Sequence, residues 1–383
     1  MKIVDVHISP SILPKKDKDW KFALRANPAF HGWIVAVEDE DGLLGYGYAA
    51  AQAQYGAPFG AVKAALDEFR SMLIGQDSRR INLINDQMDR LMTGNNQAKS
   101  GVDCALHDLK ARHFRAPLAE LFGGMATTEF RSMRILPIKT PVEMAANARV
   151  LFDEGFRNFK IKVHGHVEED VACVAAVREE VGSDASLTVD ANQSYSAKSA
   201  IDAIRRMIPF GIDLAEQPVP YNDLRSLKLV RDAVPVMVEA DESAWSLDQV
   251  ALIVREQIAD IVNLQITKLG GLTKTLAAAR ICESGGVKYR FGAHTGPALL
   301  AAHAAQLAST LPAVGYACEF TEFLGIADDP WRGLTVKDGR LLLTTTPGCG
   351  VLPRPDAGIP LAAEIRARAT PTSPVGDEEV IVI

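Results

Sequence analysis

The chain has 383 residues, a formal net charge of -7, 48% hydrophobic residues and 23% charged residues. Such a composition is typical of a globular protein, and the lack of a basic excess makes nucleic acid and anionic membranes poor candidate partners. Five single cysteines without a CxxC pair favour buried thiols in a reducing compartment over a disulfide framework or a zinc site. We therefore expect a cytoplasmic protein without an export signal or membrane span.

The first part of the chain predicts an α+β domain at residues 1–125. Residues 3–8 alternate like a strand, and residues 33–37 and 43–48 flank a turn as a hairpin. Three segments follow with helical periodicity, at residues 60–73, 81–91 and 101–113. Strands followed by helices indicate a separate capping domain.

Residues 9–31 interrupt this domain and are predicted to form one long loop. They contain three prolines, a lysine-rich run and the aromatic residues Trp20 and Phe22. A loop of this length is usually functional or disordered, so it is either a lid over a substrate or a plain mobile loop. Under the first interpretation Trp20 is a candidate substrate-binding residue.

From about residue 131 the pattern changes to alternating strands and amphipathic helices, which predicts a barrel domain at residues 126–322. Strand candidates are residues 133–137, 158–163, 186–190, 212–216, 236–241, 261–265, 289–292 and 316–319. Eight βα-type units close a barrel, whereas an open doubly wound sheet would need a glycine-rich phosphate loop that the sequence lacks. Residues 323–383 form an irregular C-terminal segment with a hairpin at 334–343 and a loosely held end.

Three carboxylates end consecutive strand candidates, namely Asp190, Glu216 and Asp241. Parallel strands place their carboxyl ends at one rim, where three such groups would repel one another without a cation. Oxygen ligands suit Mg²⁺, which keeps further positions for water or substrate. A single acid of this kind would more often be a helix cap, but three in phase predict one metal site.

Lys160 and Lys162 precede these acids by one strand. Two residues apart in a strand, they point to the same face, which is the barrel interior if Ile161 packs outward. Two adjacent ammonium groups disfavour each other's charged form, and this can make a lysine a base near neutral pH. The alternative is a solvated pair on an exposed strand, which the position beside Asp190 makes the weaker interpretation.

These motifs resemble the enolase superfamily, in particular its mandelate racemase/muconate lactonizing enzyme type. The matching motifs are KIK at 160–162, DAN at 190–192, EQP at 216–218, ADES at 240–243 and KLGG at 268–271. Asp41-Gly42, Pro117-Leu118 and the segment at 347–351 match the family's capping and closing segments. Each motif is weak alone, but their order and spacing are specific.

The resemblance implies an α/β fold, a modified TIM barrel of the (β/α)₇β type beneath an α+β capping domain to which the C-terminal segment returns. It implies one Mg²⁺ per chain, a small carboxylate-bearing substrate, and removal of the proton α to that carboxylate through a stabilised enediolate. Asp190, Glu216 and Asp241 match the metal ligands, Lys162 the base and Lys160 its partner. Asn192 and Glu319 match positions that flank or face the substrate. We also expect a homo-oligomer.

One position departs from the family pattern. The second catalytic lysine would fall at 265, where this chain has Gln265, a residue that hydrogen-bonds but does not transfer protons at working pH. Lys268 is a weaker candidate, because alternation from Gln265 would turn it away from the barrel interior. His294 follows the seventh strand in a glycine-bounded loop and is either the acid or a packed residue.

The function predicted first is dehydration or a related elimination, because Gln265 removes one of the two bases that racemisation needs. Racemisation or epimerisation of an amino acid derivative, and cycloisomerisation, are the alternatives. The alternative outside enzymes is a barrel that still binds Mg²⁺ and an acid but has lost its catalytic activity. The sequence does not identify the acid.

Overall fold

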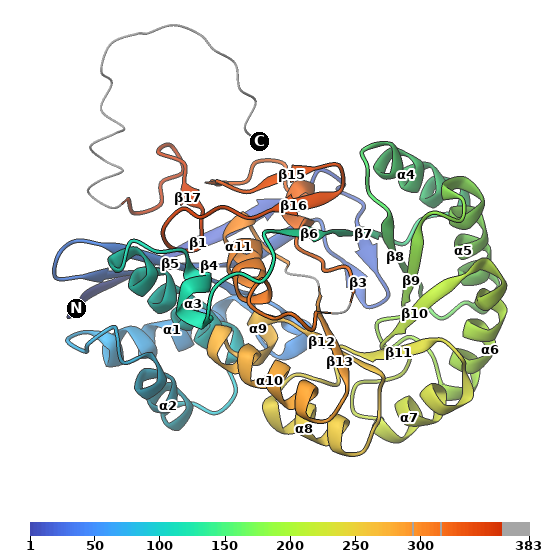
Figure 1. The fold of residues 1–383 in the computed structure, drawn as a ribbon, viewed down its shortest axis with the longest axis horizontal. Coiled ribbons are helices and arrows are strands. Elements are labelled where there is room, and N and C mark those ends of the chain that lie inside the picture. Colours follow the sequence, from blue (N-terminus) through green and yellow to red (C-terminus); the bar gives the residue numbers. More distant parts are fainter. Residues whose placement is uncertain (293–294, 315, 362–383) are drawn as a thin grey trace, which may run out of the picture.

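The computed structural model describes residues 1–292, 295–314 and 316–361, and Figure 1 shows two bodies joined side by side. The first contains an antiparallel sheet in the order β1 (Ile3–Pro14), β4 (Ala29–Asp39), β5 (Leu44–Ala50). Its helices are α1 (Phe59–Leu73), α2 (Ile81–Leu91) and α3 (Asn96–His113). The helix predicted at 101–113 thus begins five residues earlier.

Helix α3 crosses the sheet at very short range, which explains the glycines of β5. A Cβ atom on Gly47 would lie 2.0 Å from the carbonyl oxygen of Gly101, so a side chain at either position would push the helix off the sheet. Most of α3 is consequently buried, polar residues included. The capping sheet and α3 therefore form one rigid layer.

The prediction of one long loop at residues 9–31 is wrong. Strand β1 continues to Pro14 and pairs with β4 through Pro14 and Ala29, which leaves a much shorter connection. Within it, β2 (Lys21–Phe22) and β3 (Arg25–Ala26) pair as a small hairpin. Prolines at 10 and 14 hid the strand in the sequence, but β1 is an edge strand, where a missing backbone donor is tolerated.

The second body is the predicted barrel, with seven parallel strands that neighbour one another in chain order (Figure 1). They are β7 (Met133–Leu136), β8 (Asn158–Lys162), β9 (Ser186–Asp190), β10 (Ile212–Glu216), β11 (Met237–Ala240), β12 (Ile261–Leu264) and β13 (Lys288–Phe291). Long helices separate them in sequence: α4 (Pro141–Asp153), α5 (Val167–Val181), α6 (Ala197–Met207), α7 (Leu224–Ala233), α8 (Leu247–Arg255) and α10 (Leu272–Ser284).

The eighth predicted strand is reduced to a bridge that still joins the two ends of the sheet. The carbonyl oxygen of Cys318 accepts a hydrogen bond from the backbone of Met133 at 2.9 Å, and the backbone of Glu319 donates to Phe291 at 3.0 Å. Residues 318–319 therefore lie between β13 and β7. This closure places Glu319 inside the barrel, beside the first and last strands.

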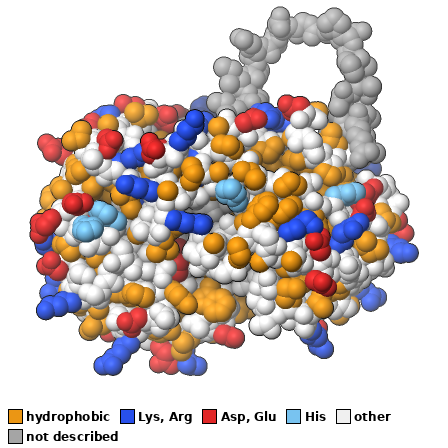
Figure 2. Space-filling model, turned by 180° about the vertical axis from the view of Figure 1, so that it is seen from behind, with side chains coloured by type: hydrophobic (Ala, Val, Ile, Leu, Met, Phe, Trp, Pro, Cys, Tyr) orange, Lys and Arg blue, Asp and Glu red, His pale blue; other side chains and the backbone are white. Residues whose placement is uncertain are grey.

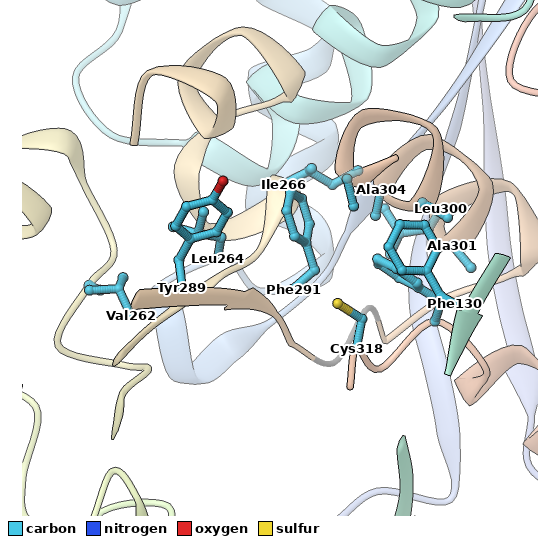
Figure 3. Close-up of a cluster of buried hydrophobic side chains, with 14 of the residues drawn as sticks. Phe130, Val262, Leu264, Ile266, Tyr289, Phe291, Leu300, Ala301, Ala304 and Cys318 are labelled. Atoms are coloured by element: carbon cyan, nitrogen blue, oxygen red, sulfur yellow. The ribbon is translucent and has the colours of Figure 1, made fainter. Parts of the chain in front are cut away.

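Alternation along the strands separates an apolar outer face from a polar interior. In Figure 3, Phe291 of β13 lies on the side of helix α11 (Ala298–Ala308), which contributes Leu300, Ala301 and Ala304, and Val262, Leu264 and Tyr289 extend the cluster away from that helix. These side chains are almost fully buried. The intervening residues, Asn263 and Arg290, therefore point to the interior, where they hydrogen-bond to Glu216.

The C-terminal segment returns to the capping sheet. The predicted hairpin is present as β15 (Thr335–Lys337) and β16 (Arg340–Leu342), and β16 also pairs with β6 (Glu129–Arg131). Farther along, the backbone of Cys349 donates to Asp108 of α3 at 2.7 Å, and the Tyr46 hydroxyl donates to Pro360 at 2.7 Å. These contacts link the end of the described chain to α3 and β5.

The molecular surface carries mixed charge. Figure 2 shows acidic and basic side chains interspersed over one face of the molecule.

All five cysteines are free and buried. Within the part of the chain that the structure describes, no helix has both the length and the apolar character needed to cross a membrane.

Candidate active site

The predicted site residues gather at the carboxyl ends of adjacent strands. Lys162 lies opposite Asp190 in the register of β8 and β9, and Asp190 lies opposite Glu216 in the register of β9 and β10. Asp241 follows β11, the next strand. All four side chains are at most 6% exposed. The topology therefore brings together the lysine and the three acids that the sequence spaced far apart.

Lys162 is held by two acceptors on the neighbouring strand. Its Nζ donates to Asp190 Oδ2 at 2.5 Å and to Asn192 Oδ1 at 2.8 Å. Asn192 in turn donates from Nδ2 to Glu242 Oε1 at 3.0 Å, and its backbone has a positive φ of 39°. A non-glycine residue in this conformation is strained, and such strain is common where a side chain must be aimed at a site.

Lys160 lies deeper and is surrounded by carboxylates. Its Nζ is 2.7 Å from Glu319 Oε2, 3.1 Å from Glu216 Oε2 and 3.3 Å from Asp190 Oδ2. Burial opposes the charged form, but attraction to these acids outweighs it and holds the pKa of Lys160 well above its usual value. We expected the two neighbouring lysines to disfavour each other's charged form. For Lys160 this expectation is wrong, because the surrounding acids favour its ammonium form.

A buried arginine completes the interior, and the sequence interpretation missed it. Arg290 Nη2 is 2.6 Å from Glu216 Oε2, and Arg290 Nε is 2.8 Å from Glu239 Oε1. Arg290 also pairs with Glu319. The sequence did contain a signal for this pair, because each strand has one charged residue among apolar neighbours. Glu239 lies two residues before Asp241 and so faces the same side, and Arg290 lies between Tyr289 and Phe291, which face the other side.

The opposite side of the site is formed by the segment after β12. Gln265 Nε2 donates to Asp241 Oδ1 at 3.0 Å. Lys268 Nζ contacts Asp241 Oδ1 at 2.6 Å, the Asp241 carbonyl at 2.7 Å and the Asn263 carbonyl at 2.9 Å. The prediction that Lys268 turns away is wrong, because strand alternation ends at Gln265 and the short helix α9 (Ile266–Leu269) carries Lys268 back under Asp241.

A cavity of about 320 Å³ opens above these residues. The barrel contributes Lys160, Lys162, Asn192 and Gln265 to its wall, and the capping domain contributes the aromatic residues Trp20, Phe22, Phe30 and Tyr55. The predicted substrate-binding residues Trp20, Asn192 and Gln265 thus face one space. Glu319 lies behind Lys160 and does not line it, and His294 lies outside the described residues.

The chemistry of the three acids bears on a Mg²⁺ site. All are buried carboxylates. Burial together with Glu216 raises the pKa of Asp241, and burial with Asp241 and Asp190 raises that of the neighbouring Glu242 to about 8, whereas Lys160 and Arg290 hold the pKa of Glu216 below its usual value despite its burial. Glu242 Oε2 is buried without a hydrogen-bond partner among the described residues. A cation bound here would relieve this repulsion, so the donor set fits a hard divalent ion.

The oxygens of the three acids do not surround a single point. Among the described residues, their oxygens are not grouped within 4.8 Å of one another. Asp190 and Glu216 share Lys160, and each acid also pairs with a second group, Asp190 with Lys162, Glu216 with Arg290 and Asp241 with Lys268. The residue types and their common rim support the predicted ligand set, while the role of each residue stays a prediction.

Family models match most of the chain. Residues 143–357 match the family described as "Enolase C-terminal domain-like", and residues 21–123 match "Mandelate racemase / muconate lactonizing enzyme, N-terminal domain". A hydrophobic dipeptide epimerase of Enterococcus faecalis is 33% identical, with 76% of this chain and 82% of that protein covered. An L-Ala-D/L-Glu epimerase of Bacillus subtilis is 30% identical, with 92% and 97% covered.

Solved structures agree with this result. The Enterococcus faecalis dipeptide epimerase complexed with Mg and the dipeptide L-Leu-L-Tyr gives a TM-score of 0.88 at 30% identity, with 92% of this chain and 99% of that chain covered. Muconate lactonizing enzyme of Pseudomonas fluorescens complexed with muconolactone gives 0.87 at 27% identity, with 92% and 96% covered. Both structural alignments extend over the capping domain and the barrel of this chain.

These relatives are epimerases and a lactonizing enzyme, so they support the isomerase alternatives better than the dehydration predicted first. The likeness extends over the capping sheet, the barrel and the closing segment, which matches the order of the motifs found in the sequence. The chain therefore belongs to the mandelate racemase/muconate lactonizing enzyme family of the enolase superfamily.

Proposed function

We propose that this protein is a Mg²⁺-dependent isomerase that removes the proton next to the carboxylate of a small acid, with Lys162 as the base. The observation that carries the proposal is the position of Lys162. It lines the cavity, and its Nζ is fixed by Asp190 and Asn192 at the rim where the three acids end. The Mg and dipeptide bound to the Enterococcus faecalis relative support the cofactor and the substrate class.

Each residue of the site would have a role that follows from its position. Lys162 accepts the proton at Nζ, and Asp190 and Asn192 hold that nitrogen toward the cavity. Lys160 supplies fixed positive charge from deeper in the barrel. A Mg²⁺ ion held by Asp190, Glu216 and Asp241 would supply positive charge to the substrate carboxylate and so make the adjacent proton more acidic. Trp20, Phe22 and Phe30 line the cavity from the capping domain.

The relatives support epimerisation of an amino acid derivative or dipeptide as the outcome. Gln265 favours a second candidate, β-elimination. Epimerisation returns the proton to the opposite face of the planar intermediate, where this chain places an amide that donates to Asp241. Elimination needs one base and an acid for the leaving group. The electron pair of the α C–H bond forms the new double bond, and the pair of the broken bond leaves with the β-substituent, so no proton has to return to the α-carbon.

The experiment is to incubate the Mg²⁺-loaded protein in D₂O with dipeptides, N-acyl amino acids, hydroxyprolines and acid sugars, followed by NMR. We expect the α-proton of at least one acid to exchange for deuterium. An inverted α-carbon supports epimerisation, and loss of a β-substituent supports elimination. Absence of both exchange and product formation across the library would contradict both reactions and leave the non-catalytic binding barrel. The cytoplasmic location and the homo-oligomer stay predictions.

A further inference from the structure

Lys15, just after strand β1, is a buried cation without a hydrogen-bond partner. Its side chain is 4% exposed, and Nζ lies 3.2 Å from the centroid of the Trp20 ring and 4.3 Å from that of Phe30. Among the described residues, none accepts a hydrogen bond from Nζ. The ring faces attract the charge, but an ammonium group has three N–H donors, and buried donors normally find acceptors.

Lys15 lines a second cavity of about 580 Å³ that adjoins the catalytic one. Trp20, Phe30, Ile135 and Glu322 belong to the walls of both cavities. Away from Lys15, apolar side chains such as Leu151 and Phe156 line the second space. The catalytic cavity therefore has a largely apolar side extension with a buried cation at the boundary between the two.

The other charged residues at this boundary are Arg134 and Glu322, and the Oε1 atom of Glu322 is buried without a hydrogen-bond partner among the described residues. Arg134 donates from Nη1 to the carbonyl oxygen of Thr321 at 2.6 Å, and it lies 3.8 Å from Glu322. Arg25, on the wall of the catalytic cavity, is exposed and donates to Gln54 at 3.0 Å. Glu322 attracts the charge of Lys15 without accepting a hydrogen bond from it, so Lys15 Nζ still lacks an acceptor among the described residues.

The position of Lys15 is also fixed by the backbone. Its N–H donates to the carbonyl oxygen of Pro28 at 2.8 Å, and the next residue, Lys16, donates to Gly325 at 2.8 Å. The segment is therefore tied to the residue before β4 and to the chain just after the barrel. Burial lowers the pKa of Lys15 to about 7, so an acceptor beside it would favour the charged form.

We propose that Lys15 binds a second anionic group of the substrate, a carboxylate separated by an apolar chain from the carboxylate at the reacting centre. The inference rests on the proposed function for the place of the first carboxylate. Under this proposal the adjoining cavity holds the apolar part of the substrate, and Lys15 determines substrate specificity. The substrate class is then a dicarboxylic acid or an acyl or peptide derivative with a free distal carboxylate.

The test measures binding to the Mg²⁺-loaded protein by calorimetry. The probes are the diacids glutarate, adipate and suberate, each against the monoacid of equal length, namely pentanoate, hexanoate and octanoate. We expect at least one diacid to bind about tenfold or more tightly than its monoacid, as a desolvated charge pair predicts. Lys15→Met should remove this preference without weakening the monoacid. Lys18→Met, which changes an exposed lysine of the same segment, should keep it.

Equal binding of diacid and monoacid by the wild-type protein would overturn the proposal, and so would an unchanged preference in Lys15→Met. Retained monoacid binding shows that the variant is folded. Lys15→Arg, which keeps the charge, should retain part of the preference. Because binding needs no turnover, the proposed function is judged separately by α-proton exchange in D₂O. Exchange that is absent while the Lys15-dependent preference persists would reject the reaction and keep the site.

Discussion

Two sides of the active site use the same residue type in opposite ways. On the β8 side, Lys162 Nζ has two side-chain acceptors and lines the catalytic cavity. On the β12 side, Lys268 Nζ has three acceptors, two of them backbone carbonyls, and does not line that cavity. Gln265 takes the place on the wall that faces the substrate.

The difference shows that a lysine's role follows from what surrounds its nitrogen. An ammonium group has three donors, so Lys268 has its full complement of acceptors and no direction left for a substrate. Lys162 has two side-chain acceptors and lines the cavity, so the third position of its nitrogen, which holds the lone pair when the amine is neutral, is left for a substrate. We therefore expect proton transfer on the β8 side and structural support on the β12 side.

The largest effect is expected from Lys162→Ala. Loss of the base should lower α-proton exchange in D₂O by about 10²- to 10⁴-fold, the usual contribution of a general base. NMR of the substrate α-proton gives the rate, and Mg²⁺ binding measured in parallel shows whether the site is otherwise intact. Exchange at the wild-type rate would place the base elsewhere and remove the asymmetry described above.

Glu216→Gln tests the rim that both sides share. We expect the Mg²⁺ dissociation constant to rise by more than about 100-fold, since loss of even an outer-shell partner costs about 10- to 100-fold in metal affinity. Calorimetry with MgCl₂ measures it. Glu168→Gln, at an exposed acid paired with Arg206, is the matched control and should bind Mg²⁺ like the wild type. Unchanged affinity in Glu216→Gln would exclude this acid as a ligand.

Lys268→Met should act on stability more than on chemistry. It leaves three buried acceptors without their donor, and breaking a buried ion pair costs about 3–5 kcal/mol. Urea unfolding measures the loss. The control is Lys274→Met, which removes a partly exposed pair with Asp89 and should cost less than about 1 kcal/mol. Exchange that falls as far as in Lys162→Ala would instead make Lys268 a catalytic residue.

Gln265→Lys should produce the smallest change in rate and the most informative change in product. A second ammonium group on the face opposite Lys162 would allow a proton to be delivered there, which epimerisation needs. We expect a larger share of inverted product, measured by chiral chromatography after reaction in D₂O. If the product ratio is unchanged while Lys162-dependent exchange persists, the face of Gln265 takes no part in protonation.

The sequence predicted the barrel strands and the acid rim because parallel strands with buried outer faces give an apolar run that ends in polar residues. It failed where local signals pointed the wrong way. Prolines concealed the end of β1, which only its position at the sheet edge permits. Strand alternation misplaced Lys268, because a helical turn begins directly after Gln265. Arg290 went unnoticed because its partners lie on other strands.

The sequence by itself determined the order of the elements, the family and the residues at the strand ends, since these depend on periodicity and spacing along the chain. Only the tertiary structure decided which charges meet. It paired Lys160 with three acids, placed Gln265 instead of Lys268 at the cavity, and left Lys15 buried against two rings. Ionisation and hydrogen bonding depend on neighbours a few ångströms away in space, and spacing along the chain does not specify those neighbours.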